Sequence, residues 1–234
     1  MSEVKRAKRV GHKGAHHIAP GNTLASFDAA LAAGVDMIEF DVLPERGSDR
    51  LLLAHDYEDA ERPDVIELDE GLAHLCGAPY EGIELDVDLK TTGYEDRVVG
   101  ALRARGLLDR ALISTMEMES IDRLNDIAPS ARLGLSVPKL RRDPLQTWYT
   151  RYPAMVVGGV ARELLPGRTA SAIRAGRYDA LMCHFALVTP RLVKAVHDAG
   201  GELYVWTVDS ADRIAKLEAM GVAGVITNDP RLFA

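Results

Sequence analysis

Apolar residues recur along the chain in short blocks that alternate between the two-residue period of strands and the 3.6-residue period of helices. The first helical block follows Asn22-Thr23, a pair suited to an N-cap, and ends at Gly34. Its apolar face comprises Leu24, Phe27, Ala30 and Leu31. Strand-like blocks at 7–12 and 37–43 flank this helix, so the chain is predicted to begin with a β–α–β unit.

The same unit repeats to the end of the sequence. Strands are predicted at 7–12, 37–43, 83–90, 111–114, 133–137, 180–184, 202–207 and 224–227, with a short extra strand at 51–55. Helices are predicted at 70–76, 94–105, 118–127, 190–199 and 210–220, and the weaker pattern from 143 to 177 suggests helices around 145–152 and 169–175. Eight strands with helices between them predict a single (β/α)8 TIM barrel. We assign it to residues 7–234, after an N-terminal tail at 1–6.

Composition narrows the class of ligand. The 234 residues are 47% hydrophobic and 27% charged, as in a folded globular domain. A net charge of −7 argues against a nucleic-acid partner and favours a small molecule or a metal. Cys76 and Cys183 are too few for a disulfide framework, and no signal peptide or apolar membrane span is visible. These features lead us to expect a cytoplasmic protein without a stable membrane anchor.

Acidic residues gather near the ends of two predicted strands, where the active sites of such barrels lie. Glu39 and Asp41 share one strand face, and Glu84, Asp86, Asp88 and Lys90 share one face of another strand. With apolar neighbours facing the outer helices, the acids should point inward, where uncompensated charge is costly. A hard cation, Mg²⁺ or Ca²⁺, would compensate them. The alternative is a structural cluster in which Lys13, Lys90 and water neutralise the acids.

Two histidines at strand ends extend this pattern. His12 and His55 could exchange protons near neutral pH, and phosphodiester hydrolysis needs both a base and an acid. Structural histidines are common, but a pair beside a carboxylate cluster favours catalysis. Four other histidines are expected to be surface or loop residues: His16, His17, His74 and His197. His184 also ends a predicted strand, so the sequence does not decide between a structural and a functional role for it.

The motifs resemble those of the glycerophosphodiester phosphodiesterase family. The resemblance rests on 11–15, 20–27, 34–42 and His55-Asp56, and continues at 85–90, 205–208 and 221–230. It implies a metal-dependent TIM barrel that cleaves glycerophosphodiesters into glycerol 3-phosphate and an alcohol. By that resemblance the general acid and base would be His12 and His55; the metal ligands Glu39, Asp41 and Asp88; the phosphate-binding residues Lys13 and Lys90; and the substrate-pocket wall Trp206.

The sequence departs from the family pattern at four places. Lys13 replaces an arginine and loses its bidentate fork, Gly21 replaces a glutamate, and Asp88 replaces a longer glutamate. The insertion that usually follows the His-Asp motif is shortened or absent, so we expect a more open pocket, and the alternative substrate is a bulkier, lysophospholipid-type diester. Two other interpretations remain: a non-catalytic phosphodiester-binding barrel, and an unrelated barrel isomerase, although no glycine-rich phosphate loop follows the last two strands.

Overall fold

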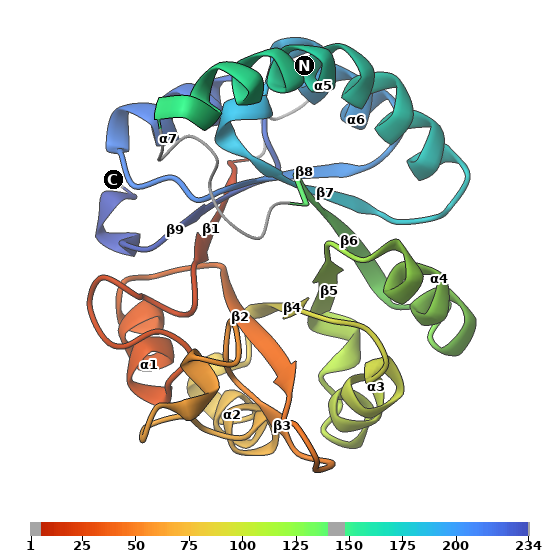
Figure 1. Cartoon of the computed structure of the whole chain (residues 1–234). Coiled ribbons are helices and arrows are strands. Elements are labelled where there is room, and N and C mark those ends of the chain that lie inside the picture. The colour runs from red at the N-terminus through yellow and green to blue at the C-terminus, as the bar shows by residue number, and fades with distance from the viewer. Residues whose placement is uncertain (1–5, 140–147, 234) are drawn as a thin grey trace.

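The protein folds into a closed parallel barrel, which confirms the predicted TIM-barrel class. The structure, a computed structural model, describes residues 6–139 and 148–233. Eight strands form the barrel in chain order, and pairing of β1 with both β9 and β2 closes it (Figure 1). They are β1 (Lys8–Gly11), β2 (Met37–Pro44), β4 (Glu84–Leu89), β5 (Ala111–Thr115), β6 (Arg132–Val137), β7 (Ala180–His184), β8 (Glu202–Trp206) and β9 (Gly224–Thr227).

Helices follow the strands and surround the barrel (Figure 1). They are α1 (Leu24–Ala32), α2 (Leu68–Leu75), α3 (Glu95–Ala104), α4 (Met118–Ile127), α5 (Trp148–Arg174), α6 (Pro190–Asp198) and α7 (Ala211–Ala219). Thr23 is the N-cap of α1: its side chain accepts a hydrogen bond from the Ser26 backbone, and the Ser26 side chain accepts one from the Thr23 backbone. This capping box begins α1 where the sequence predicted.

The segment after β2 is short. β3 (Leu51–Leu52) pairs antiparallel with β2, and the chain then reaches β4 through α2 and the 3-10 turns η1 (Asp59–Glu61) and η2 (Ala78–Tyr80). The extra strand is therefore shorter than the predicted 51–55. Across these described residues no further domain interrupts the barrel, in agreement with the expected shortening of the insertion.

Helix α5 differs from the prediction. Two helices were expected, at 145–152 and 169–175, and the start of the first lies outside the described residues. The structure has one helix of 27 residues from Trp148 to Arg174, which lies beside α6 and continues through Pro166 (Figure 1). Proline and glycine weaken helix patterns because they lower intrinsic propensity, and here tertiary packing outweighs that preference.

Strand alternation divides the apolar core into two layers. One set fills the barrel interior and comprises Val10, Met37, Leu112, Ala180, Met182, Tyr204 and Ile226. The alternate positions, including Ile38, Phe40, Val87 and Leu181, pack outward among the helices. At the amino-terminal ends of the strands, Arg132 bridges Glu84 and Glu202 at 2.7 and 2.6 Å. The opposite, carboxyl end of the interior is therefore the place where a ligand can enter.

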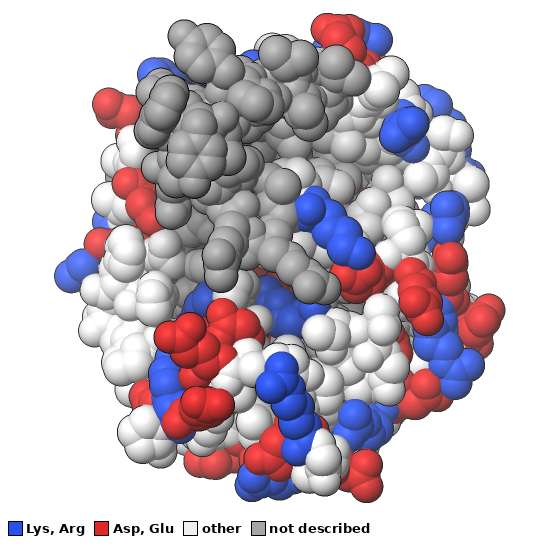
Figure 2. Space-filling view, in the orientation of Figure 1, with Lys and Arg blue, Asp and Glu red and all other residues white. Residues whose placement is uncertain are grey.

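Charges of both signs are interspersed over the face seen in Figure 2, outside the atoms drawn in grey. Blue and red side chains alternate around its rim and do not form one basic patch there. In the part of the chain that the structure describes, no helix has both the length and the apolar character needed to cross a membrane.

Candidate active site

Four carboxyl groups from two neighbouring strands meet inside the barrel. The parallel register of β2 and β4 places Glu39 opposite Asp86 and Asp41 opposite Asp88. Glu39, Asp41 and Asp86 are buried, with at most 4% of the residue surface exposed. One oxygen each from Glu39, Asp41 and Asp88 lies within 4.8 Å of the other two. The three residues expected to be metal ligands are thus brought together.

Two lysines contact these acids. The Lys90 ammonium forms ion pairs with both Asp41 and Asp88, and Lys13 Nζ lies 3.2 Å from Asp41 Oδ2. The Lys13 backbone N–H also donates a 2.7 Å hydrogen bond to Glu39 Oε2. Lys90 lines the pocket described below, whereas Lys13 is not among its lining residues. Both lysines therefore bind carboxylates here, and only Lys90 is placed to meet a ligand directly.

The two lysines do not balance the four acids. Burial raises the pKa of Glu39 well above its usual range, that of Asp86 to about 7, and that of Asp88. Asp41 is the exception, because Lys90 and then Lys13 outweigh the effect of burial and hold its pKa well below the usual range.

Some carboxylate oxygens of the cluster receive no hydrogen bond from the described residues. Among the described residues, the buried atoms Asp88 Oδ1 and Asp86 Oδ2 have no hydrogen-bond partner. A surplus of buried carboxylates with an open acceptor at Asp88 suits a hard divalent cation, which prefers oxygen ligands.

Asn22 fixes the orientation of Asp41. Its amide donates a 2.9 Å hydrogen bond to Asp41 Oδ2, and its carbonyl oxygen accepts one of 3.1 Å from the Asp41 backbone. Asn22 has a φ of 61°, in the left-handed region that asparagine tolerates better than most residues. Sequence reasoning assigned Asn22 to the helix cap and missed this role.

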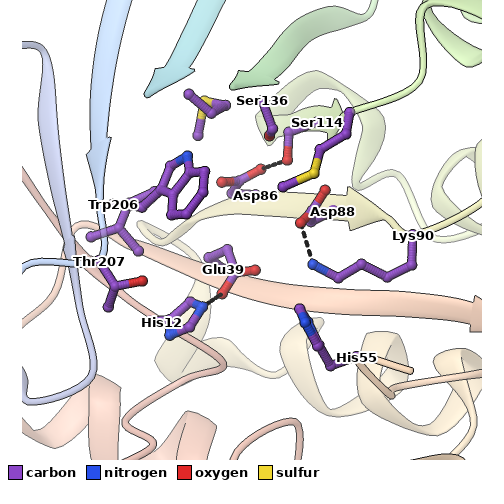
Figure 3. Close-up of a pocket in the computed structure, with 13 residues that line it drawn as sticks. His12, Glu39, His55, Asp86, Asp88, Lys90, Ser114, Ser136, Trp206 and Thr207 are labelled. Atoms are coloured by element: carbon purple, nitrogen blue, oxygen red, sulfur yellow. Dashed lines mark hydrogen bonds and ion pairs between the residues drawn. The ribbon is translucent and has the colours of Figure 1, made fainter. Parts of the chain in front are cut away.

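A cavity of about 160 Å³ lies above the acids and holds both candidate catalytic histidines. Figure 3 shows His12 and His55 in this pocket, with Trp206 on one side and Lys90 on the other. Glu39, Asp86 and Asp88 also line it, and Ser114 Oγ donates a 2.6 Å hydrogen bond to Asp86 Oδ1. Every pocket residue expected from the sequence is present except Asp41 and Lys13, which contact the lining residues from outside.

The two histidines have different surroundings. His55 is half exposed, and its Nδ1 lies 3.3 Å from Asp41 Oδ2. The His12 side chain is 22% exposed, and its Nδ1 lies 2.6 Å from Asn228 Oδ1. Burial, followed by the nearby Lys13 charge, lowers the pKa of His12 to about 4. Asn228 was not recognised as a site residue; it follows β9, whose pairing with β1 brings it beside His12.

Three other histidines have structural contacts. His16 Nδ1 accepts a hydrogen bond from the Gly21 backbone, and His74 Nε2 lies 2.8 Å from Asp28. His184, left open by the sequence, accepts a hydrogen bond from Ala186 and packs edge-on against the Trp206 ring with centroids 5.2 Å apart. His184 is not among the residues that line the pocket, so it supports the pocket wall and does not face the acids.

Comparisons with known proteins point to one enzyme family. The model of the glycerophosphoryl diester phosphodiesterase family matches residues 12–56 and 85–232. A glycerophosphodiester phosphodiesterase from Caldanaerobacter subterraneus is 23% identical, over 94% of this chain and 93% of its own length. Glycerophosphodiester phosphodiesterase GDPD4 from Arabidopsis thaliana is 26% identical, over 95% of this chain and 70% of its own length.

Solved structures show the same fold. A phosphodiesterase from Oleispira antarctica, in complex with the product sn-glycerol-3-phosphate, superposes with a TM-score of 0.72 at 19% identity. The superposition covers 97% of this chain and 94% of that one. A glycerophosphodiester phosphodiesterase structure from Agrobacterium tumefaciens gives a TM-score of 0.69 at 20% identity, over 97% of this chain and 98% of that one.

Proposed function

Because the chain belongs to the glycerophosphoryl diester phosphodiesterase family and is a phosphoric diester hydrolase, we propose that it hydrolyses glycerophosphodiesters by a metal-dependent mechanism with two catalytic histidines. The products would be glycerol 3-phosphate and an alcohol. The observation that carries the proposal is the convergence of Glu39, Asp41 and Asp88 within 4.8 Å beneath a pocket that contains His12 and His55. We further propose that residues 7–234 act as one functional unit.

The three clustered carboxylates would hold Mg²⁺ or Ca²⁺. When bound, the ion would supply Lewis-acid polarisation of the phosphoryl oxygens. Asn22 would keep Asp41 turned toward this position, because both ends of its amide are bonded to Asp41. Lys90 would neutralise charge that develops on the phosphate, since its ammonium lies at the pocket wall. Lys13 would act behind it by neutralising Asp41.

The histidines would divide the proton transfers. As an oxygen–phosphorus bond forms to water, one imidazole takes a proton from that water. As the phosphorus–oxygen bond to the alcohol breaks, the other imidazole donates a proton to the departing oxygen. One proton is gained and one is lost, and exchange with solvent restores both rings. Trp206 would form a flat apolar wall for the organic part of the substrate.

The short segment between β3 and β4 bears on the substrate. The described residues 57–84 contain one helix and two 3-10 turns and do not match the family model. His55, at the start of this segment, is half exposed. With a shorter segment than the usual family insertion, the pocket beside His55 is less covered. This favours a diester with a bulkier alcohol, such as a lysophospholipid-type compound, as a substrate in addition to small glycerophosphodiesters.

The test is hydrolysis of a substrate panel followed by phosphorus NMR. Glycerophosphocholine, glycerophosphoethanolamine and lysophospholipids would be incubated with the protein and Mg²⁺ or Ca²⁺, with and without EDTA. We expect glycerol 3-phosphate from at least one small diester, loss of activity with EDTA, and loss in His12→Ala. His197→Ala, on α6, is the matched control and should retain activity. Activity that persists in both EDTA and His12→Ala would refute the mechanism.

A further inference from the structure

A chain of hydrogen bonds behind His12 determines which ring nitrogen carries the proton. Asp209 Oδ2 accepts a 2.7 Å hydrogen bond from the Asn228 side-chain amide, and Asp209 Oδ1 accepts one of 2.9 Å from the Asn228 backbone. The Thr227 hydroxyl donates to the same Oδ1 at 3.0 Å. On the other side, Asn228 Oδ1 lies 2.6 Å from His12 Nδ1. The side chains of Asp209, Asn228 and His12 thus form one continuous path of hydrogen bonds.

The direction of this path follows from donor and acceptor chemistry. An ionised carboxylate only accepts hydrogen bonds, so the Asn228 group facing Asp209 must be the NH₂. The flipped amide would place two acceptor oxygens against each other. Asn228 therefore presents its oxygen to His12, and a 2.6 Å contact with an acceptor requires a proton on Nδ1.

The other nitrogen is left as the acceptor. His12 Nε2 is 3.8 Å from Glu39 Oε2, which is too long for a hydrogen bond that would hold a proton there. The His12 ring also lines the pocket, and its backbone N–H is fixed by a 2.8 Å hydrogen bond to the Thr227 carbonyl. In the neutral ring, the lone pair on Nε2 is therefore free to take a proton.

We propose that Asp209 and Asn228 are positioning residues that hold neutral His12 in the Nδ1–H tautomer, so that Nε2 is the base of the reaction. This rests on the proposed function and assigns its two proton transfers. The water proton goes to His12 Nε2 as oxygen bonds to phosphorus, and His55 donates the proton that the departing alcohol oxygen takes. Asp209 and Asn228 act through His12, and Asp209 is not among the residues that line the pocket.

Exchanging the two side chains tests the path. In Asp209→Asn, the new amide oxygen would still accept hydrogen bonds from the Asn228 backbone N–H and from the Thr227 hydroxyl. The new NH₂ group would then face the side-chain amide of Asn228. Asn228 would then turn its own NH₂ toward His12 and move the ring proton to Nε2. We expect kcat to fall by about 10²-fold or more, with little change in KM, because general base catalysis contributes roughly 10²–10⁴-fold. The double variant Asp209→Asn/Asn228→Asp restores an acceptor for His12 and should recover most of the lost kcat.

Asp229→Asn is the matched control, because Asp229 is adjacent to Asn228 but pairs with Arg231. Its kcat should stay close to that of the unmodified protein. Nitrogen-15 NMR of histidine-labelled, Mg²⁺-loaded protein gives a second readout: Nδ1 protonated in the unmodified protein and the double variant, Nε2 protonated in Asp209→Asn.

Two results would overturn the proposal: a folded Asp209→Asn with unchanged kcat, or a neutral His12 with its proton on Nε2 in the unmodified protein. A folded double variant as slow as Asp209→Asn would do the same. If no diester is hydrolysed at all, the proposed function fails, while the NMR measurement still decides the tautomer. The NMR measurement on the unmodified protein also tests the proposal if Asp209→Asn does not fold.

Discussion

Binding of a divalent cation should stabilise the protein measurably, because the site holds four carboxyl groups and, among the described residues, two lysines contact them. A ligand that binds only the folded state at one hundred times its Kd contributes about 2.7 kcal/mol. For a chain of 150–250 residues, 1 kcal/mol shifts Tm by roughly 2–4 °C. At that saturation we therefore expect Mg²⁺ or Ca²⁺ to raise Tm by about 5–11 °C over the chelated protein.

Asp88→Asn tests whether the carboxylates are the site. The substitution keeps the side-chain shape, and Lys90 retains its ion pair with Asp41. If affinity falls tenfold, the same ion concentration leaves about 1.4 kcal/mol, or a Tm shift of roughly 3–6 °C. A hundredfold loss would leave a shift of only about 1–2 °C.

Glu84→Gln is the matched control, since Glu84 begins the same strand and pairs with Lys8 and Arg132 at the other end of the barrel. Its baseline Tm can fall, but the increase on adding the ion should stay complete. Calorimetric titration would set the Kd, and scanning fluorimetry would measure Tm. The reasoning is wrong if Asp88→Asn keeps the whole increase, or if millimolar ion leaves the Tm of the unmodified protein unchanged.

Three further substitutions test how the fold supports the site. Tyr94→Phe removes a buried hydroxyl that donates a 2.7 Å hydrogen bond to a strand carbonyl, and urea unfolding should show a loss of about 1–2 kcal/mol. The hydrogen bond from Tyr80 lowers the pKa of Asp28, so its ionised form stabilises the fold above the unfolded pKa and this contribution disappears as pH falls through the folded value. The deficit of Asp28→Asn in urea midpoint should therefore shrink from pH 6 to pH 3; a constant deficit would contradict this. Gly14→Ala should cost several times the roughly 1 kcal/mol of Gly34→Ala in the same assay, because both glycines have positive φ but only at Gly14 would the new Cβ meet another atom, at 2.5 Å.

Most of the barrel could be predicted from the sequence because its signals are local. Strands β7 and β9 and helix α4 begin and end at the predicted residues, since alternation or helical spacing together with turn residues marks them. The sequence failed at α5, where Pro166 and nearby glycines lower the local helix preference and packing beside α6 restores the helix. A local pattern cannot contain that information.

The residues of the candidate site also divide into those that the sequence predicted and those that it missed. Strand alternation predicted that the acids of both strands point inward, and the family resemblance then singled out Glu39, Asp41 and Asp88 as the expected metal ligands. Asn22 and Asn228 could not be identified, because each acts through a partner distant in the sequence, and an asparagine in a turn has many ordinary roles. The predicted barrel makes the first and last strands neighbours, but it does not show which side chain after the last strand meets His12.

The two departures closest to the metal site are compatible with its geometry. The shorter Asp88 side chain still reaches the cluster because it lies directly opposite Asp41 in the strand register, and its oxygen remains within 4.8 Å of those of Glu39 and Asp41. Lys13, where an arginine was expected to clamp phosphate, holds Asp41 through its ammonium and Glu39 through its backbone N–H. A lysine can do this because pairing with a single carboxylate oxygen needs a point charge and not a planar fork. Of these two lysines, Lys90 is the one that lines the pocket, so in the proposed mechanism charge neutralisation of the phosphate would depend more on this residue.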